Sequence, residues 1–215
     1  MINILCFGDS NTFGFNPEWT APQEMRFPKD KRWTGILGRM LGEGYEIIEE
    51  GLGGRTTAWD DPPTQGRNGL KEIVPLLQTH QPLDLIILML GTNDAKRVYN
   101  ASAMEIGRGM EELVKICLNP YVYDIMKTPK VLIISPVRLG EKIRTSWLGD
   151  VFDEDSANRV EQLASIYKRI ADTYGCGFLD AADVAKVSET DSVHIGMEEH
   201  RKLAEAIERE IRKLV

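Results

Sequence analysis

Near its N-terminus the sequence reads INILCFGDSNTFG, residues 2 to 14, and this stretch decides the fold. A short apolar run that closes at Gly8 is typical of a buried strand in a parallel sheet. Ser10 then lies in the loop just past the carboxyl end of that strand, at the edge where open α/β sheets bind ligands. An ordinary loop with an Asp-Ser helix cap would give the same local pattern, so the rest of the chain must separate the two interpretations.

The composition indicates a single globular domain over residues 1–215. Of the 215 residues 42% are hydrophobic and 27% are charged, and the net charge is −7. The acidic balance argues against nucleic acid or an anionic membrane surface as a partner, because both attract basic faces. No apolar run is long enough to span a membrane. Because the three cysteines lack metal-ligand spacing and no leader pattern is visible, we expect a cytoplasmic protein with no metal or other cofactor.

Apolar runs and amphipathic segments alternate along the chain. The apolar runs predict strands at residues 2–7, 45–50, 83–90, 130–135 and 176–180. The amphipathic segments predict helices at residues 33–41, 70–77, 102–118, 155–174 and 197–215. Strands joined by helical crossovers form parallel sheets that are covered on both faces. We therefore predict a three-layer α/β/α sandwich with a five-stranded parallel sheet in flavodoxin-like order, and long loops at residues 16–32 and 139–150.

Unusual polar residues and glycines follow four of these five strands. Ser10 follows the first strand, Gly54 the second, Asn93 the third, and Asp191 and His194 the fifth. Because the carboxyl ends of parallel strands share one edge of the sheet, we expect these residues to converge there. On its own, His194 would be interpreted as a surface loop residue. The other polar residues expected at the same edge favour a functional role.

The residue types at this edge suit acyl transfer. A serine hydroxyl needs an adjacent imidazole to accept its proton, and the imidazole needs a carboxylate that fixes its tautomer. The negative oxygen of a tetrahedral intermediate needs preorganised donors. Gly54 can offer a closely approaching backbone N–H, and Asn93 can offer a side-chain N–H.

Four sequence blocks resemble those of the SGNH (GDSL-type) hydrolases, in the same order and at similar separations. The blocks are Gly8-Asp9-Ser10-Asn11, Gly54, Gly91-Thr92-Asn93-Asp94 and Asp191-x-x-His194. Each block alone is a weak signal, but four in register across essentially the whole chain are strong. Asn11 departs from the family motif, which has Leu at this variable position.

Further stretches resemble the bacterial arylesterase/acyltransferase branch of that family. They are Arg32-Trp33-Thr34-Gly35, Ile48-Glu49-Glu50-Gly51-Leu52, Arg55-Thr56-Thr57, Asp60-Asp61-Pro62 and Met89-Leu90-Gly91-Thr92-Asn93-Asp94. This resemblance implies hydrolysis of short acyl (acetyl-type) esters of small molecules. It also implies, for some members, acyl transfer to alcohols or action on acetylated carbohydrates, and frequent assembly into homo-oligomers.

The resemblance also implies a role for each converging residue. Ser10 is expected to be the nucleophile, His194 the base and Asp191 the residue that orients His194. The N–H groups of Ser10 and Gly54, with the Asn93 side chain, are expected to form the oxyanion hole. Gly53 is the neighbouring candidate, and Gly54 is preferred because it directly precedes Arg55-Thr56.

Other residues near this edge have weaker assignments. The candidates for substrate binding are Asn11, Phe13, Trp19, Arg55 and Trp147. The loop aromatics would equally serve ordinary packing or an oligomer interface, and Arg55 would brace a loop if it did not contact substrate. Asp9 and Asp94 are predicted to support their loops. His80 and His200 are predicted to be helix-surface residues, and Asp60-Asp61 a solvated turn rather than a metal site.

A flavodoxin-like module that binds a nucleotide or flavin phosphate is the alternative function. The predicted fold suits it, because Gly-rich strand-to-helix loops can hold phosphate. The stretch Gly51-Leu52-Gly53-Gly54 lacks the dinucleotide-binding spacing, however, and no phosphate-loop motif is present. A third possibility, a sheet that has lost catalysis and serves only in assembly, gives no reason for all these residue types to occur together.

Overall fold

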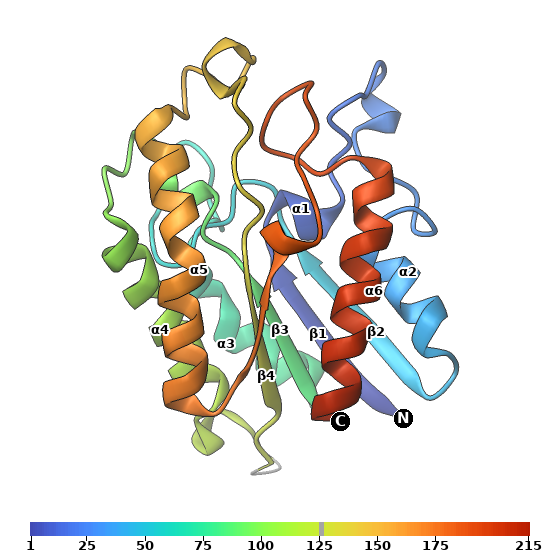
Figure 1. Ribbon diagram of the computed structural model, residues 1–215. Coiled ribbons are helices and arrows are strands. Elements are labelled where there is room, and N and C mark those ends of the chain that lie inside the picture. The colour runs from blue at the N-terminus through green and yellow to red at the C-terminus, as the bar shows by residue number, and fades with distance from the viewer. Residues whose placement is uncertain (125–126) are drawn as a thin grey trace.

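The computed structural model describes residues 1–124 and 127–215 and contains the predicted five-stranded parallel sheet (Figure 1). The strand order is β2-β1-β3-β4-β5, and all four neighbouring pairs are parallel. The strands are β1 (Ile2–Gly8), β2 (Tyr45–Gly51), β3 (Leu85–Met89), β4 (Lys130–Ser135) and β5 (Gly177–Asp180). The predicted fold class is therefore confirmed.

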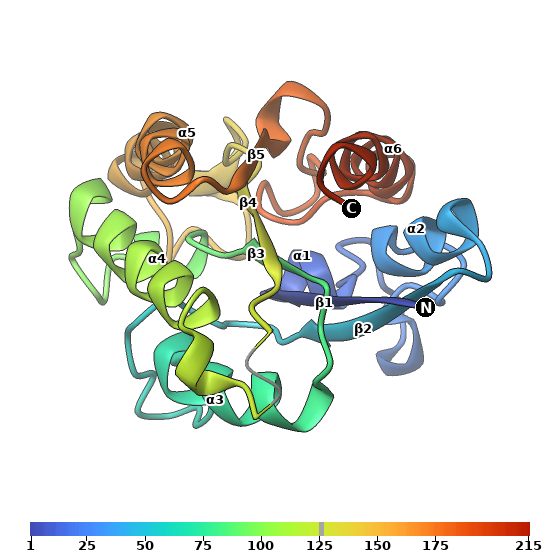
Figure 2. The same ribbon diagram turned by 90° about the horizontal axis from the view of Figure 1, so that it is seen from below.

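Helices cover both faces of the sheet, as Figure 2 shows. They are α1 (Ser10–Phe13), α2 (Trp33–Leu41), α3 (Gly69–His80), α4 (Ala103–Cys117), α5 (Glu154–Tyr174) and α6 (Met197–Leu214). Alternate residues of a strand point to opposite faces. Leu5 and Phe7 accordingly pack under α3, α4 and α5, whereas Ile4 and Cys6 pack under α2 and α6.

Some boundaries differ from those predicted. The third strand ends at Met89 rather than at residue 90, because the backbone turns at Gly91, which has a φ of +125°. Helix α3 begins at Gly69 with Asn68 as its N-cap, whose side chain accepts the Leu70 N–H. The helix continues to His80, which therefore lies within it instead of beyond its end.

The segment after β1 forms a short, capped helix whose residues Ser10 to Thr12 are buried. Asp9 caps the four-residue helix α1 by accepting the N–H of Asn11 at 2.9 Å. The helix ends at Phe13 and is capped by Gly14, whose φ of +82° strongly favours glycine. The Asp-Ser cap that the sequence suggested is therefore present, and it holds Ser10 at the first position of a short helix directly above the sheet.

The two long loops rise above the carboxyl edge of the sheet (Figure 1). The loop over residues 16–32 contains one turn of 3-10 helix at Pro22–Glu24, and the loop over 139–150 contains another at Ile143–Thr145. Among the described residues, none of the helices combines the length and apolar character that a membrane crossing demands.

Candidate active site

Three side chains from opposite ends of the chain form a continuous hydrogen-bonded row at the carboxyl edge of the sheet. Nε2 of His194 lies 2.9 Å from Oγ of Ser10, and Nδ1 of His194 lies 2.6 Å from Oδ2 of Asp191. Asp191 is fully buried, while Ser10 and His194 each keep 7% of their surface exposed. The row therefore runs from the interior to a point that solvent and small molecules can reach.

The loop that carries His194 is built around Asp191. Its second carboxylate oxygen, Oδ1, accepts the backbone N–H groups of Val193 and His194, each at 2.9 Å. Burial acts to raise the pKa of Asp191, but these bonds and the His194 side chain hold that pKa below its ordinary value. Ser192, which directly follows Asp191, has a φ of +63°, a conformation that costs energy for a residue other than glycine. The loop is therefore held in one conformation at some energetic cost.

Gly54 and Asn93 follow the carboxyl ends of β2 and β3, the two strands that neighbour β1 in the sheet. One N–H of the Asn93 side chain donates to the carbonyl of Arg55 at 3.1 Å, which fixes the amide and leaves its second N–H for another acceptor. Gly54 has a φ of +82°, and its N–H has no acceptor among the described residues. Neighbouring Gly53 lies close to Ser10, since a Cβ placed on it would be 4.0 Å from the Ser10 Cβ.

Asp94 joins the loops that carry Gly54 and Asn93. Its Oδ1 accepts the backbone N–H of Thr57 at 2.8 Å and the Thr57 hydroxyl at 2.5 Å. Burial raises the pKa of Asp94 to about 7. Burial also raises the pKa of Asp9, whose carboxylate caps α1. Both carboxylates thus support their loops, as the sequence suggested.

Asn11 and Arg55 both bind neighbouring parts of the protein, and their expected contact with substrate stays a prediction. Asn11 accepts the Ile195 N–H at 3.0 Å and donates to the Val193 carbonyl at 3.4 Å, so it ties α1 to the His194 loop. Arg55 is buried, donates to the carbonyls of Gly8 and Glu50, and stacks on the ring of Phe7. Of the two roles considered for Arg55, the structure favours bracing.

The predicted aromatic candidates differ in their surroundings. The Arg26 guanidinium covers the Phe13 ring at 4.2 Å, Trp19 is 38% exposed, and Trp147 is 61% exposed. The sequence reasoning missed Phe15, whose ring centroid lies 4.3 Å from that of His194 and 6.5 Å from that of Trp147. Its position directly after Gly14 was the available signal, because the turn there redirects the chain toward the site.

His200 is not a helix-surface residue, as predicted, but is fully buried. It lies in the first turns of α6, where its Nδ1 accepts the backbone N–H of Trp33 at 3.2 Å and its ring packs edge-on against Phe27. Burial, followed by the charges of Arg32 and His194, lowers the pKa of His200 to about 3. His80 is half-buried, and its Nε2 lies 2.9 Å from a carboxylate oxygen of Glu50.

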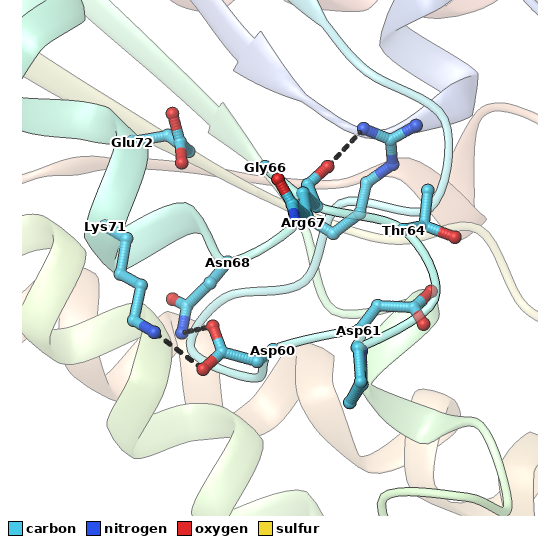
Figure 3. Close-up of a pocket in the computed structure, with 10 residues that line it drawn as sticks. Asp60, Asp61, Thr64, Gly66, Arg67, Asn68, Lys71 and Glu72 are labelled. Atoms are coloured by element: carbon cyan, nitrogen blue, oxygen red, sulfur yellow. Dashed lines mark hydrogen bonds and ion pairs between the residues drawn. The ribbon is translucent and has the colours of Figure 1, made fainter.

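A separate open cavity of about 380 Å³ lies beside the Gly54 loop (Figure 3). Asp60, on its wall, accepts a hydrogen bond from Asn68 at 3.1 Å and binds Lys71 at 2.6 Å, so this carboxylate is neutralised by an internal partner. Arg67 extends along the opposite wall toward Gly54. Neither Ser10 nor His194 lines this cavity, which is therefore distinct from the row of Ser10, His194 and Asp191.

Comparison with known proteins identifies the class. The sequence model of the GDSL-like lipase/acylhydrolase family matches residues 6–200, so the chain belongs to that family and is a carboxylic ester hydrolase.

Solved structures of esterases resemble the chain over its full length. A carbohydrate acetylesterase from Sinorhizobium meliloti is 35% identical, with a TM-score of 0.92 and 100% of each chain covered. The aryl esterase of M. smegmatis is 37% identical, with a TM-score of 0.91 and 100% of each chain covered. A putative arylesterase from Agrobacterium tumefaciens is 34% identical, with a TM-score of 0.88 and the same coverage. The arylesterase branch suggested by the sequence fits these structures.

One curated relative differs in length. An uncharacterized lipoprotein of Bacillus subtilis is 29% identical over 93 residues. The match covers 43% of this chain and only 32% of that lipoprotein.

Proposed function

We propose that the protein hydrolyses short-chain acyl esters through a covalent acyl-enzyme on Ser10. The observation that carries the proposal is the row Asp191–His194–Ser10, with consecutive separations of 2.6 and 2.9 Å, at the edge of the sheet. A serine hydroxyl becomes an effective nucleophile only with such a base, and the base needs an oriented carboxylate. This proposal assigns a chemical role to each of the three side chains.

In the first step Oγ of Ser10 attacks the ester carbonyl while its proton moves to Nε2 of His194. The carbonyl π electrons move to the oxygen, which becomes an oxyanion. When the tetrahedral intermediate collapses, the bond to the alcohol oxygen breaks and His194 returns the proton to that oxygen. Water then repeats the sequence on the acyl-enzyme and releases the carboxylic acid.

Three donors stabilise the oxyanion in this proposal: the N–H groups of Ser10 and Gly54 and the free N–H of the Asn93 side chain. Support comes from the hydrogen bond that fixes Asn93 on the Arg55 carbonyl and from the unoccupied N–H of Gly54 among the described residues. Donors that are fixed before the reaction stabilise developing charge without a reorganisation cost.

Acetyl-type esters are the proposed substrates. The support is the likeness to a carbohydrate acetylesterase and to aryl esterases over the full chain, together with the family resemblance. An alcohol in place of water would take the acyl group in the same way, so acyl transfer is proposed as a side reaction. Family membership disfavours the flavodoxin-like binding module.

Two further expectations stay predictions. Assembly into homo-oligomers rests on the family resemblance alone. The cytoplasmic location rests on the sequence, and the partial match to a lipoprotein gives a reason to measure it directly.

Intact mass after exposure to a fluorophosphonate, followed by peptide mapping, tests the proposal. We expect one adduct on Ser10 in the wild type, because this reagent labels activated serines. Ser10→Ala should abolish the adduct, and His194→Ala should slow its formation by orders of magnitude. Labelling that is absent from folded wild-type protein, or that persists in Ser10→Ala, would contradict the proposed nucleophile.

A further inference from the structure

Two aromatic rings follow the imidazole of His194 in space, first Phe15 and then Trp147. The Phe15 ring is tilted by 38° to the His194 ring at a centroid distance of 4.3 Å, and the Trp147 indole is the next ring outward at 6.5 Å. Trp147 is 61% exposed although it is among the largest apolar side chains of the protein. An apolar ring that stays exposed next to a reactive group is available to contact a ligand.

Phe15 is fixed by the same segment that carries Ser10. Its backbone N–H donates to the carbonyl of Ser10 at 2.9 Å, and its backbone pairs with Arg26 in an isolated bridge. Trp147 comes from the loop over 139–150, where the Ser146 hydroxyl accepts the N–H of Leu148 at 3.1 Å. Two loops that are far apart in sequence thus bring their rings together, with Phe15 against the imidazole of His194 and Trp147 against Phe15.

The proposed reaction determines which part of an ester lies on this surface. The carbonyl oxygen must point to Gly54 and Asn93, because the oxyanion forms there. The alcohol oxygen must lie within hydrogen-bond reach of Nε2 of His194, because that atom returns the proton as the carbon–oxygen bond breaks. The alcohol part of the ester is therefore on the His194 side, where Phe15 and Trp147 lie.

We propose that Phe15 and Trp147 form the leaving-group subsite, which selects alcohols with a flat apolar face. This inference rests on the proposed function. Both an aryl alcohol and the C–H face of a sugar ring present such a surface, and either one can pack on an indole. Microscopic reversibility gives the subsite a second role, since an alcohol that accepts the acyl group must occupy the position from which an alcohol leaves.

Trp147→Ala tests the subsite with two acetates that differ in ring content. Phenyl acetate carries an aromatic leaving group, and 2,2,2-trifluoroethyl acetate carries a small leaving group of low basicity. We expect the ratio of kcat/KM for phenyl acetate to that for trifluoroethyl acetate to fall about fivefold to tenfold, the range typical of one aromatic contact. Because both esters give the same acetyl-enzyme, its hydrolysis should proceed at an unchanged rate.

A matched control is Tyr121→Ala. Tyr121 is 84% exposed, but it lies between α4 and β4 at the amino edge of the sheet, away from the site. Tyr121→Ala should leave the ratio of kcat/KM for phenyl acetate to that for trifluoroethyl acetate unchanged. Acetylated xylose, added as a third substrate, distinguishes the two sources of a flat face. If Trp147→Ala lowers kcat/KM for acetylated xylose as much as for phenyl acetate, the subsite also takes sugars. If the loss is confined to phenyl acetate, the subsite takes aryl alcohols.

Two results would overturn the inference. An unchanged ratio in Trp147→Ala would show that the leaving group does not contact the indole. A parallel loss on both acetates, with a changed apparent mass in solution, would assign Trp147 to an interface between copies of the chain. If the wild type still forms the fluorophosphonate adduct on Ser10 in either case, only the subsite fails. If no adduct and no hydrolysis are seen, the proposed function fails and the subsite with it.

Discussion

His194 and His200 are both buried and lie only six residues apart, yet their surroundings are opposite. His194 has the Asp191 carboxylate on Nδ1 and the Ser10 hydroxyl on Nε2. His200 has a backbone N–H donor, that of Trp33, on Nδ1. Burial and the charge of Arg32 lower the pKa of His200 to about 3, so this ring stays neutral at physiological pH.

The comparison teaches that the partner of a buried histidine, rather than its burial, decides what the ring can do. A carboxylate on Nδ1 compensates the positive charge that forms when Nε2 accepts a proton. A backbone N–H on Nδ1 instead requires a neutral ring, since the nitrogen must supply its lone pair. His194 is therefore suited to proton transfer, and His200 is suited to accepting the first N–H of α2.

The largest expected effect is that of Asp191→Asn. The amide oxygen can still accept the N–H groups of Val193 and His194, but the charge that orients His194 is lost. We expect kcat for an acetate ester to fall about 10⁴-fold, as in other serine triads, with little change in the melting temperature. His200→Asn is the matched comparison, and a loss of kcat as large as that of Asp191→Asn would break the distinction between the two histidines.

Asn93→Ala should have the next largest effect. Removing one oxyanion donor is expected to lower kcat about 10²- to 10³-fold. The loss should be the same factor at each pH, because Asn93 does not titrate and its side-chain hydrogen bond is to the Arg55 carbonyl. A pH–rate profile of changed shape would instead indicate that Asn93 acts through the base.

His200→Asn should alter the pH dependence of stability. The folded-state pKa of His200, about 3, lies below the ordinary value of 6.5, so the unfolded chain binds more protons between these values. This group therefore makes the wild type less stable as the pH falls below about 6.5, by up to about 1.4 kcal/mol per pH unit. The variant should gain stability relative to the wild type over that interval, as urea unfolding from pH 7 to pH 4.5 would measure.

His80→Gln is the control for that experiment, because His80 is a half-buried residue on the other face of the sheet. It should not reproduce the relative gain of His200→Asn at acidic pH. If both variants behave alike, the burial of His200 is not the cause of the pH dependence.

Asp94→Asn should give a pH dependence of stability of opposite sign. Burial raises the folded-state pKa of Asp94 to about 7, so the stability associated with its proton is fully present below about 4 and is lost as the pH rises through 7. Asn keeps an oxygen for Thr57 and carries no charge, so the variant should gain stability relative to the wild type as the pH rises from 4 to 7. A gain that is equal at all pH values would contradict the assignment. In the wild type, the effect of His200 on stability rises with pH and the effect of Asp94 falls with pH, so the two partly cancel between about pH 4 and 6.5. Each variant removes one of the two effects and leaves the other to be measured.

Much of the architecture was predictable because it depends on local pattern. The apolar runs around Ile4 and Ile87 predicted strands, and Ser102 predicted the start of a helix, since its side chain and that of Glu105 form a reciprocal cap. The parallel direction of the strands follows from the alternation of strands and helices. The edge where Ser10 and His194 meet was therefore predictable before any coordinate was known.

Contacts between distant segments were not predictable in the same way. His200 sits on an amphipathic helix, and the sequence does not show that α2 packs over its side chain. Arg55 looked like a candidate ligand until its guanidinium was placed on the carbonyls of Gly8 and Glu50. The position of Phe15 after Gly14 indicates a turn but not the contact with His194, because that contact joins residues at opposite ends of the chain.

The sequence by itself determined the layers, the parallel sheet and the set of residue types collected at its carboxyl edge, because periodicity and strand-to-helix alternation are local properties. Only the tertiary structure decided how those residues pair. It set the separations along the row Asp191–His194–Ser10, bonded Asn11 and Arg55 to neighbouring backbone, and placed the Phe15 ring beside His194 and the Trp147 ring beside Phe15. The physical reason is that a hydrogen bond or a ring contact depends on ångström-scale placement of two side chains, which the packing of the whole chain sets.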